Sequence, residues 1–171
     1  MNYALTIIVP VYNEQDNLQR LEKELLKYLE IASKPACVLL VNDGSSDNSL
    51  AMIQDICERN TAFGYLSFVK NCGLSAAIKA GFDAASTPWV GYIDSDLQTD
   101  PEDFNALLAH AETHALVTGV RANRKDKFVK NMSSKIANGI RRAFTHDGMD
   151  DTGCPLKIIR TDCAKKIPMF R

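Results

Sequence analysis

The sequence predicts an α/β fold of the Rossmann-like kind, a three-layer sandwich in which a mostly parallel central sheet has helices on both faces. Short apolar segments alternate with longer segments whose apolar residues recur at helical spacing. The short segments are apolar without interruption, which is typical of strands buried on both faces of a parallel sheet. Because 171 residues suffice for one domain with a substantial core, we expect a single domain over residues 1–171.

Five apolar, β-branched segments in the first 120 residues are the predicted strands of this sheet. The first is expected to end before Pro10, because proline has no backbone N–H for the sheet ladder. The fourth begins at Trp89 and becomes acidic at Asp94. A sixth, short strand is predicted near the C-terminus. The predicted strands are residues 5–9, 37–41, 65–69, 89–93, 116–120 and 157–160.

Four helices are predicted between these strands from the spacing of their apolar residues. Asn13 is expected to cap the first helix, with Asp16 three residues later. The fourth has Asp100 as its N-cap and Pro101 in its first position. The four apolar faces are formed by Leu18, Leu21, Leu25 and Leu29, by Leu50, Ile53, Ile56 and Cys57, by the small residues Ala76, Ala77, Ala80, Gly81, Ala84 and Ala85, and by Phe104, Leu107, Leu108 and Ala111.

The composition is that of an ordinary globular protein, with 46% hydrophobic and 24% charged residues. Its five cysteines are scattered and form no C-x-x-C pair, which indicates reduced thiols rather than a disulfide framework. No apolar run approaches the roughly 18 residues of a membrane helix, and the N-terminus has no signal-peptide pattern. We therefore expect a cytoplasmic protein.

The net charge of −1 conceals an uneven distribution of charge along the chain. Residues 1–120 contain 7 Lys and Arg and 16 Asp and Glu, whereas residues 121–171 contain 13 and 5. The basic part predicts an anionic partner, although a solvated helix face over residues 127–142 would explain the same charges equally well. The basic residues concentrated just after the fifth predicted strand are Arg121, Arg124, Lys125, Lys127, Lys130, Lys135, Arg141 and Arg142.

Asp94, Asp96 and Gln98 follow the fourth predicted strand at alternate positions. Two carboxylates this close repel each other and must be hydrated, so they do not belong in a protein core. A divalent cation such as Mg²⁺ or Mn²⁺, which prefers hard oxygen ligands, would relieve the repulsion. Taken alone, however, the segment is more typical of a solvated acidic loop before a helix.

The ends of other predicted strands make the acidic segment more informative. Asp43 ends the second strand as Asp94 ends the fourth, and the first strand leads into residues 10–14, which include Tyr12 and Glu14. Carboxyl ends of parallel strands open on one edge of the sheet, where α/β proteins bind ligands. We therefore expect these side chains to line one crevice, with the Tyr12 ring available to stack on a base.

Four segments in register resemble the family 2 glycosyltransferases of the GT-A fold, and within them the polyprenyl-phosphate branch that includes dolichol-phosphate mannose synthase and undecaprenyl-phosphate sugar transferases. The resemblance runs from residue 5 to about residue 160. One departure is Asn42, where many relatives have a second Asp. The segments are Ile8-Val9-Pro10-Val11-Tyr12-Asn13-Glu14, Val41-Asn42-Asp43-Gly44-Ser45-Ser46-Asp47, Asn71-Cys72-Gly73-Leu74-Ser75-Ala76-Ala77, and Asp94-Ser95-Asp96-Leu97-Gln98.

The resemblance implies a role for each motif residue. The nucleotide-sugar ligands would be Pro10, Tyr12, Glu14, Asp43 and Asp94. The metal ligands for Mg²⁺ or Mn²⁺ would be Asp96 and Gln98, and the catalytic residues Asp94, Asp96 and Arg121. The acceptor side would include Arg124, Lys130 and Asp151.

The resemblance also implies an activity, the transfer of a sugar with inversion from a UDP- or GDP-sugar to an acceptor, most simply a polyprenyl phosphate. Such an enzyme would work at the inner face of the membrane in cell-envelope polysaccharide synthesis, without a nucleic-acid partner. Residues 1–120 would bind the nucleotide sugar and residues 121–171 would form the acceptor side. The chain ends without a terminal cap, so we expect the catalytic domain to be truncated at its C-terminus. A saccharide acceptor, or a fragment that binds nucleotide without turnover, remains open.

Two other classes of protein fit less well. A nucleotidyltransferase would need a glycine-rich, basic triphosphate loop near the first strand, which residues 10–14 do not supply. A receiver domain would need an acidic pair after the first strand and a phosphorylatable Asp after the third, where Lys70-Asn71-Cys72 stands instead.

Overall fold

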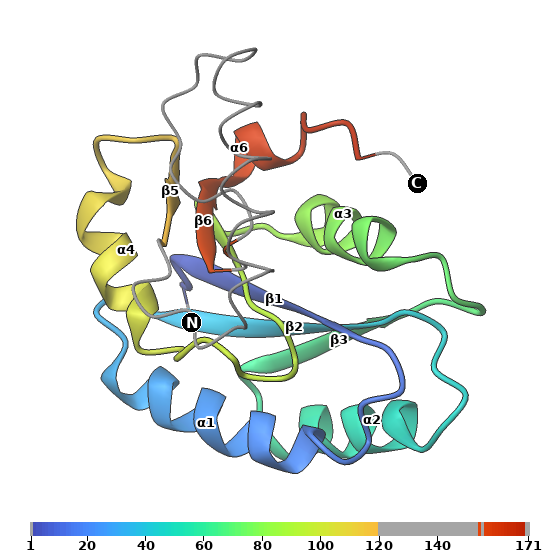
Figure 1. The fold of residues 1–171 in the computed structure, drawn as a ribbon. Coiled ribbons are helices and arrows are strands. Elements are labelled where there is room, and N and C mark those ends of the chain that lie inside the picture. The colour runs from blue at the N-terminus through green and yellow to red at the C-terminus, as the bar shows by residue number, and fades with distance from the viewer. Residues whose placement is uncertain (1, 120–153, 155, 170–171) are drawn as a thin grey trace, which may run out of the picture. The chain divides into compact units, whose positions relative to one another are not determined.

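The computed structural model describes residues 2–119, 154 and 156–169. The chain forms two compact units, Met1–Val117 with Pro155–Arg171, and Thr118–Cys154. The first holds the sheet and helices shown in Figure 1. In chain order the described elements are β1 (Leu5–Val11), α1 (Leu18–Ile31), β2 (Ala36–Asn42), α2 (Ser49–Arg59), β3 (Phe63–Ser67), α3 (Leu74–Ala84), β4 (Trp89–Tyr92), α4 (Asp103–Ala111), β5 (Leu116–Thr118), β6 (Lys157–Arg160) and α6 (Thr161–Ala164).

The six strands form one sheet in the order β3-β2-β1-β4-β6-β5. Strands β1 to β4 pair in parallel, whereas β6 runs antiparallel to β4. The prediction of a mostly parallel sheet with helices on both faces is therefore confirmed. The chain goes outward from β1 to β2 and β3, and then crosses to β4 on the other side of β1. The crevice between β1 and β4 is thus the topological switch point of the sheet, where ligands bind in open α/β folds.

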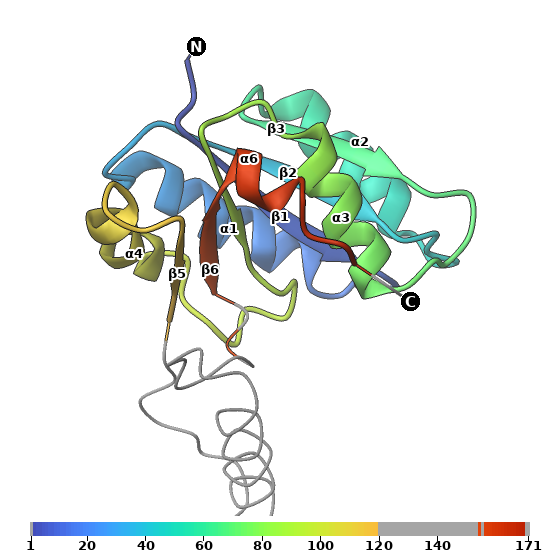
Figure 2. The same ribbon diagram turned by 90° about the horizontal axis from the view of Figure 1, so that it is seen from above.

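Helices α1 and α2 cover one face of the sheet and α3 and α6 cover the other (Figures 1 and 2). Two glycines bring helices close to the strands. A Cβ on Gly81 of α3 would lie 2.6 Å from Cγ2 of Ile8, and one on Gly91 of β4 would lie 2.7 Å from Cε1 of Phe104 in α4. The Phe104 ring also packs on Tyr28 of α1, with the ring centroids 5.8 Å apart. The two layers of core are therefore tightly packed at the strands that lead to the switch point.

Strand β1 continues through Pro10 to Val11, which corrects the predicted end before the proline. The carbonyl of Ile8 accepts the N–H of Ile93 on the β4 side, and the carbonyl of Val11 accepts the N–H of Asp43 on the β2 side. Because successive residues face alternate neighbours, Pro10 faces the β4 side, beyond the last residue of β4. The missing N–H of Pro10 therefore costs no ladder bond.

Other element boundaries also differ from the predictions. Helix α1 begins at Leu18 rather than just after Asn13, and β3 occupies residues 63–67 rather than 65–69. Helix α4 begins at Asp103, after a turn in which Asp100 accepts a hydrogen bond from the N–H of Glu102 at 3.0 Å. Strand β6 has the predicted bounds, whereas the basic segment over residues 127–142 lies outside the described residues.

Candidate active site

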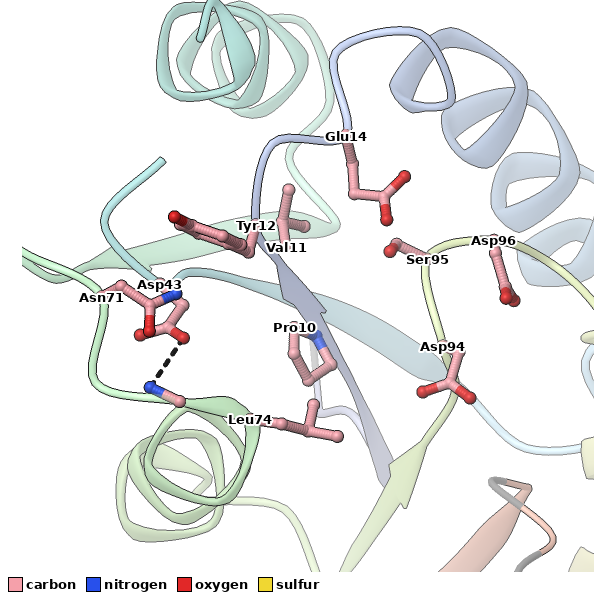
Figure 3. A pocket seen from close by; sticks show the side chains of 11 residues that line it. Pro10, Val11, Tyr12, Glu14, Asp43, Asn71, Leu74, Asp94, Ser95 and Asp96 are labelled. Carbon is pink, nitrogen blue, oxygen red and sulfur yellow. Dashed lines mark hydrogen bonds between the residues drawn. The ribbon is translucent and has the colours of Figure 1, made fainter. Parts of the chain in front are cut away.

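A cavity of about 300 Å³ opens at the carboxyl ends of β1, β2 and β4, beside the switch point. Figure 3 shows Asp43 and Asn71 at one end and Asp94 and Asp96 at the other, with Pro10 between them. The volume lies at the lower end of the range for small-molecule sites. The lining residues are Pro10, Val11, Tyr12, Glu14, Asp43, Asn71, Gly73, Leu74, Asp94, Ser95 and Asp96.

The loop after β1 is clipped to the loop after β2 by reciprocal hydrogen bonds. The backbone N–H of Asn13 donates to Oγ of Ser45 at 3.0 Å, and Oδ1 of Asn13 accepts the N–H of Ser46 at 2.8 Å. The N–H of Glu14 donates to Oγ of Ser49, which is buried. Asn13 has a φ of 55°, a left-handed conformation that asparagine tolerates better than most residues. The clip fixes the backbone that carries Tyr12 and Glu14.

A second pair of bonds extends the clip toward α2. The N–H of Gln15 donates to Oδ2 of Asp47, while Oε1 of Gln15 accepts the N–H of Asn48. Slight desolvation raises the pKa of Asp47, but hydrogen bonds from Ser49 and from the backbone outweigh it and hold that pKa below its ordinary value. Asp47 is therefore ionised at neutral pH, as a hydrogen-bond acceptor in this position requires.

Asp43 joins the loop after β2 to the start of α3. The residue is only 4% exposed, and its two carboxylate oxygens accept hydrogen bonds from the N–H groups of Cys72 at 2.7 Å and Gly73 at 2.9 Å. The neighbouring Gly44 has a φ of +66°, and a Cβ there would lie 2.2 Å from the carbonyl carbon of Lys70. The two loops are thus in backbone contact. Asp43 is a structural anchor of the cavity as well as one of its walls.

The acidic end of the cavity comes from the loop after β4. The hydroxyl of Tyr92 donates to Oδ1 of Asp94, and the backbone N–H of Gln98 donates to Oδ1 of Asp96 at 3.1 Å. Burial raises the pKa of the Tyr92 hydroxyl, and the hydrogen bond to Asp94 and the charges of Asp94 and Asp96 raise it further. Tyr92 is therefore a neutral donor to a carboxylate throughout the ordinary pH range.

The donor set at this end suits a hard divalent cation, because it offers carboxylate oxygens from Asp94 and Asp96 on the cavity wall. In the part of the chain that the structure describes, no group of three or more His, Cys, Asp or Glu side chains is placed to hold a metal ion. A cation here would therefore need oxygens from a bound ligand or from water to complete its coordination.

Six predicted site residues line the one cavity, namely Pro10, Tyr12, Glu14, Asp43, Asp94 and Asp96. Gln98 is exposed and is not among the lining residues; it contacts Asp96 through its backbone. The predicted residues Arg121, Arg124, Lys130 and Asp151 lie outside the described residues.

The sequence prediction missed Val11, Asn71, Gly73, Leu74 and Ser95 as lining residues. Asn71 and Gly73 belong to a segment that carried the family resemblance, and Ser95 stands between the two acids, so position in a motif was the available signal. Val11 and Leu74 belong to such segments as well. Leu74 is 54% exposed at the first position of α3, and apolar spacing alone does not distinguish it from a core leucine.

The family model for glycosyl transferase family 2 matches residues 6–167. The chain belongs to this family. Over 160 residues it is also 34% identical to an undecaprenyl-phosphate 4-deoxy-4-formamido-L-arabinose transferase of Enterobacter sp. (strain 638), covering 92% of this chain and 49% of that protein. The chain thus spans about half the length of this curated relative. The predicted family, and the resemblance to its polyprenyl-phosphate branch, are confirmed.

Solved structures of glycosyltransferases share the GT-A fold of this family 2 chain. A mannosyltransferase from Pyrobaculum calidifontis in complex with GDP-Man and Mn²⁺ matches 100% of this chain and 48% of its own, with a TM-score of 0.68 at 18% identity. Glucosyl-3-phosphoglycerate synthase from Mycobacterium tuberculosis, in complex with Mn²⁺, UDP and glucosyl-3-phosphoglycerate, matches 94% of this chain and 57% of its own, with a TM-score of 0.69 at 13% identity. At such identities the likeness establishes the fold alone.

Among the helices of the described residues, none is long and apolar enough to cross a membrane.

Proposed function

We propose that this family 2 chain binds a nucleotide-diphosphate sugar, a UDP- or GDP-sugar, and transfers its sugar to a polyprenyl phosphate. The observation that carries the proposal is that the two ends of the cavity differ in their side chains. Asp43, Tyr12 and Asn71 lie at one end, and the two acids Asp94 and Asp96 lie at the other. A nucleotide sugar has the same two-ended character, with hydrogen-bonding base and ribose groups at one end and a diphosphate at the other. The relatives bound to GDP-Man or UDP support the donor class.

The nucleoside end is proposed to use Pro10, Tyr12, Glu14 and Asp43. The exposed ring of Tyr12 offers a face for the base, and Leu74 adds an apolar surface on the other side of the cavity. The carboxylate of Glu14 accepts a hydrogen bond from Nδ2 of Asn17 at 2.5 Å, and this bond holds the Glu14 side chain at the cavity wall. These residues bind and orient the donor, and Asp94 continues the contact toward the diphosphate.

Asp96, with Asp94 beside it, is proposed to hold Mg²⁺ or Mn²⁺ together with the diphosphate oxygens, and Gln98 is proposed as a further ligand. The bound cation would supply Lewis-acid stabilisation of the negative charge that develops on the leaving diphosphate. The relatives bound to Mn²⁺ support this metal class. Arg121 is proposed to add a positive charge on the same oxygens.

The acceptor is proposed to be a lipid phosphate, as in the name of the undecaprenyl-phosphate relative. A phosphate oxygen is ionised at neutral pH and can attack the anomeric carbon while the bond to the diphosphate breaks, which inverts that carbon. Such a nucleophile needs no strong base, which agrees with the absence of histidine from the four motifs. Residues 121–171, with Arg124, Lys130 and Asp151, are proposed as the acceptor side, and the enzyme is proposed to work at the cytoplasmic membrane surface.

The test is calorimetric titration of the chain with UDP and with GDP, in Mn²⁺, in Mg²⁺ and in EDTA. We expect one of the two nucleotides to bind, and its affinity to fall at least about tenfold in EDTA, because two neighbouring carboxylates repel an uncompensated diphosphate. Equal affinity in EDTA would remove the metal role. If neither UDP nor GDP binds, the proposed function is overturned. If a nucleotide binds but no sugar is transferred, the proposal holds only for donor binding.

A further inference from the structure

Asp94 stands at the acidic end of the cavity, but its contact to the rest of the protein comes from a residue that does not line the cavity. The hydroxyl of Tyr92 donates to Oδ1 of Asp94. An ionised carboxylate only accepts hydrogen bonds, so this bond leaves Oδ2 as its other oxygen for a ligand. Asp96 differs, because the N–H of Gln98 that it accepts belongs to its own loop.

Tyr92 is held by the sheet through its backbone and by the core through its ring. Its backbone is the last residue of β4 and pairs with Ile8 of β1 on one side and with Lys157 of β6 on the other. Its side chain packs against the apolar cluster beneath α3, which includes Ala77, Phe82 and Val90. The phenol oxygen is therefore fixed by the sheet and the core, whereas the residues after Ile93 belong to a loop.

We propose that Tyr92 is a positioning residue that fixes the Asp94 carboxylate against the donor nucleotide. The inference rests on the proposed function and adds to it a residue outside the cavity wall. Two consequences follow from the bond. The hydrogen bond from Tyr92 holds the Asp94 carboxylate in one orientation before any ligand binds. The same bond places a neutral donor on Asp94, which partly offsets the repulsion between the Asp94 and Asp96 carboxylates. Tyr92 touches neither substrate nor metal in this arrangement and acts only through Asp94.

The test is Tyr92→Phe, which removes the hydroxyl and keeps the ring in the core. The matched control is Tyr28→Phe, because the Tyr28 hydroxyl is buried and has no hydrogen-bond partner among the described residues. We expect Tyr92→Phe to weaken binding of UDP or GDP with Mn²⁺ on the order of tenfold, as for loss of a hydrogen bond to a charged group. Tyr28→Phe should leave the affinity unchanged. Wild-type affinity in Tyr92→Phe would overturn the inference.

A double-mutant cycle separates positioning from a merely structural role. In the Asp94→Ala background, Tyr92→Phe should change the nucleotide affinity by no more than about twofold, since there is no carboxylate left to position. The same tenfold loss in that background would mean that the hydroxyl acts through packing, and would overturn the inference.

Crystal structures of the ligand-free wild type and Tyr92→Phe give a readout that needs no nucleotide. Asp94 should occupy one rotamer in the wild type and should change or split its rotamer in the variant. An identical, equally ordered Asp94 in both would overturn the inference even if the wild type binds nucleotide. Conversely, a rotamer change together with no nucleotide binding by the wild type would sink the proposed function and leave the role of Tyr92 in orienting Asp94 intact.

Discussion

Asp43 combines two demands that usually fall on different residues. Its carboxylate is buried and holds the N–H groups of Cys72 and Gly73, which start α3. It also lines the cavity, where it is the proposed nucleoside ligand. Each carboxylate oxygen has a second lone pair, so the two backbone bonds do not exhaust its capacity to accept from a ligand. A substitution here therefore disturbs both the loop and the site.

Asp43→Asn should lower the free energy of unfolding by about 1–3 kcal/mol, because the amide nitrogen would face a backbone N–H and leave it unpaired. The control is Asp96→Asn, an exposed position where we expect a change within about 0.5 kcal/mol. Urea denaturation measures both. In titrations, Asp43→Asn should weaken nucleotide binding with or without metal, whereas Asp96→Asn should remove mainly the metal-dependent increment. If both variants lose only that increment, the proposed division between nucleoside and metal ligands is wrong.

The loops at the carboxyl edge behave as one connected element rather than as separate turns. Asn13 and Gln15 bind the loop after β2, and Asp43 binds the loop after β3. Gly44 lies where these loops meet, and its contact is with backbone atoms of Lys70 and Asn71, which cannot rotate away as a side chain would. The connected loops make the cavity, which is the proposed donor site, largely preformed.

Gly44→Ala should cost at least about 2 kcal/mol of stability, because it combines a left-handed φ with a backbone clash at 2.2 Å. Gly64→Ala is the matched control in β3, where the nearest atom to a new Cβ is Cδ1 of Leu39 at 3.9 Å. There we expect a change of less than about 1 kcal/mol, in either direction. Thermal unfolding of the two variants measures the difference. Equal stabilities would show that the loops can move apart at little cost.

The connected loops also explain which elements were predictable from sequence. The strand cores were predictable, because short continuous apolar runs rich in β-branched residues favour strands buried in a sheet. The start of α1 was not predictable, because residues 13–15 bond with the loop after β2 and the first residue of α2, more than 30 residues away. The predicted third strand was displaced because its register is set by pairing with β2, and Val69 is fully exposed beyond its end, 104% by relative area. Helical and strand periods carry no information about such distant partners.

At the scale of the molecule, the site was predictable to the extent that it follows from topology. Residues at the carboxyl ends of neighbouring parallel strands lie close together regardless of the sequence that connects the strands. Six of the predicted side chains therefore line the same cavity. Gln98 was placed by motif position alone, and the turn around Leu97, with a φ of 53°, separates it from the lining residues. Asn71, Gly73 and Leu74 come from the loop after β3 and the first residue of α3. The approach of this segment to the site depends on Asp43 rather than on strand order.

The uneven charge of the whole chain gives a prediction about membranes. If residues 121–142 serve a lipid-phosphate acceptor, the chain should sediment with vesicles in proportion to their anionic lipid and detach in salt, at about 1 kcal/mol per basic residue near the surface. Changing Lys127, Lys130, Lys135 and Arg142 to Gln should weaken sedimentation and leave nucleotide affinity unchanged.

The control for total charge is a variant with Arg20, Lys23, Lys27 and Lys34 changed to Gln, which removes the same four charges from the first unit. The described ion pairs of Lys27 and Lys34 are exposed and contribute little to stability. This control should sediment like the wild type. If the wild type ignores anionic vesicles at low salt, the family assignment is unaffected, but the lipid acceptor loses its main physical support.

The order β4-β6-β5 has a consequence for how such enzymes diversify. The chain leaves the sheet at β5 and returns at β6, and these two strands are neighbours. The entry and exit points of the intervening 38 residues, 119–156, are therefore set by the sheet whatever their sequence or length. Loop closure between such fixed ends adds only slowly to the entropic cost as an insert grows. An exchange of this insert between relatives should leave β1 to β4 in register. If the insert forms the acceptor side, as proposed above, recombination at β5 and β6 would change the acceptor and keep the proposed nucleotide site.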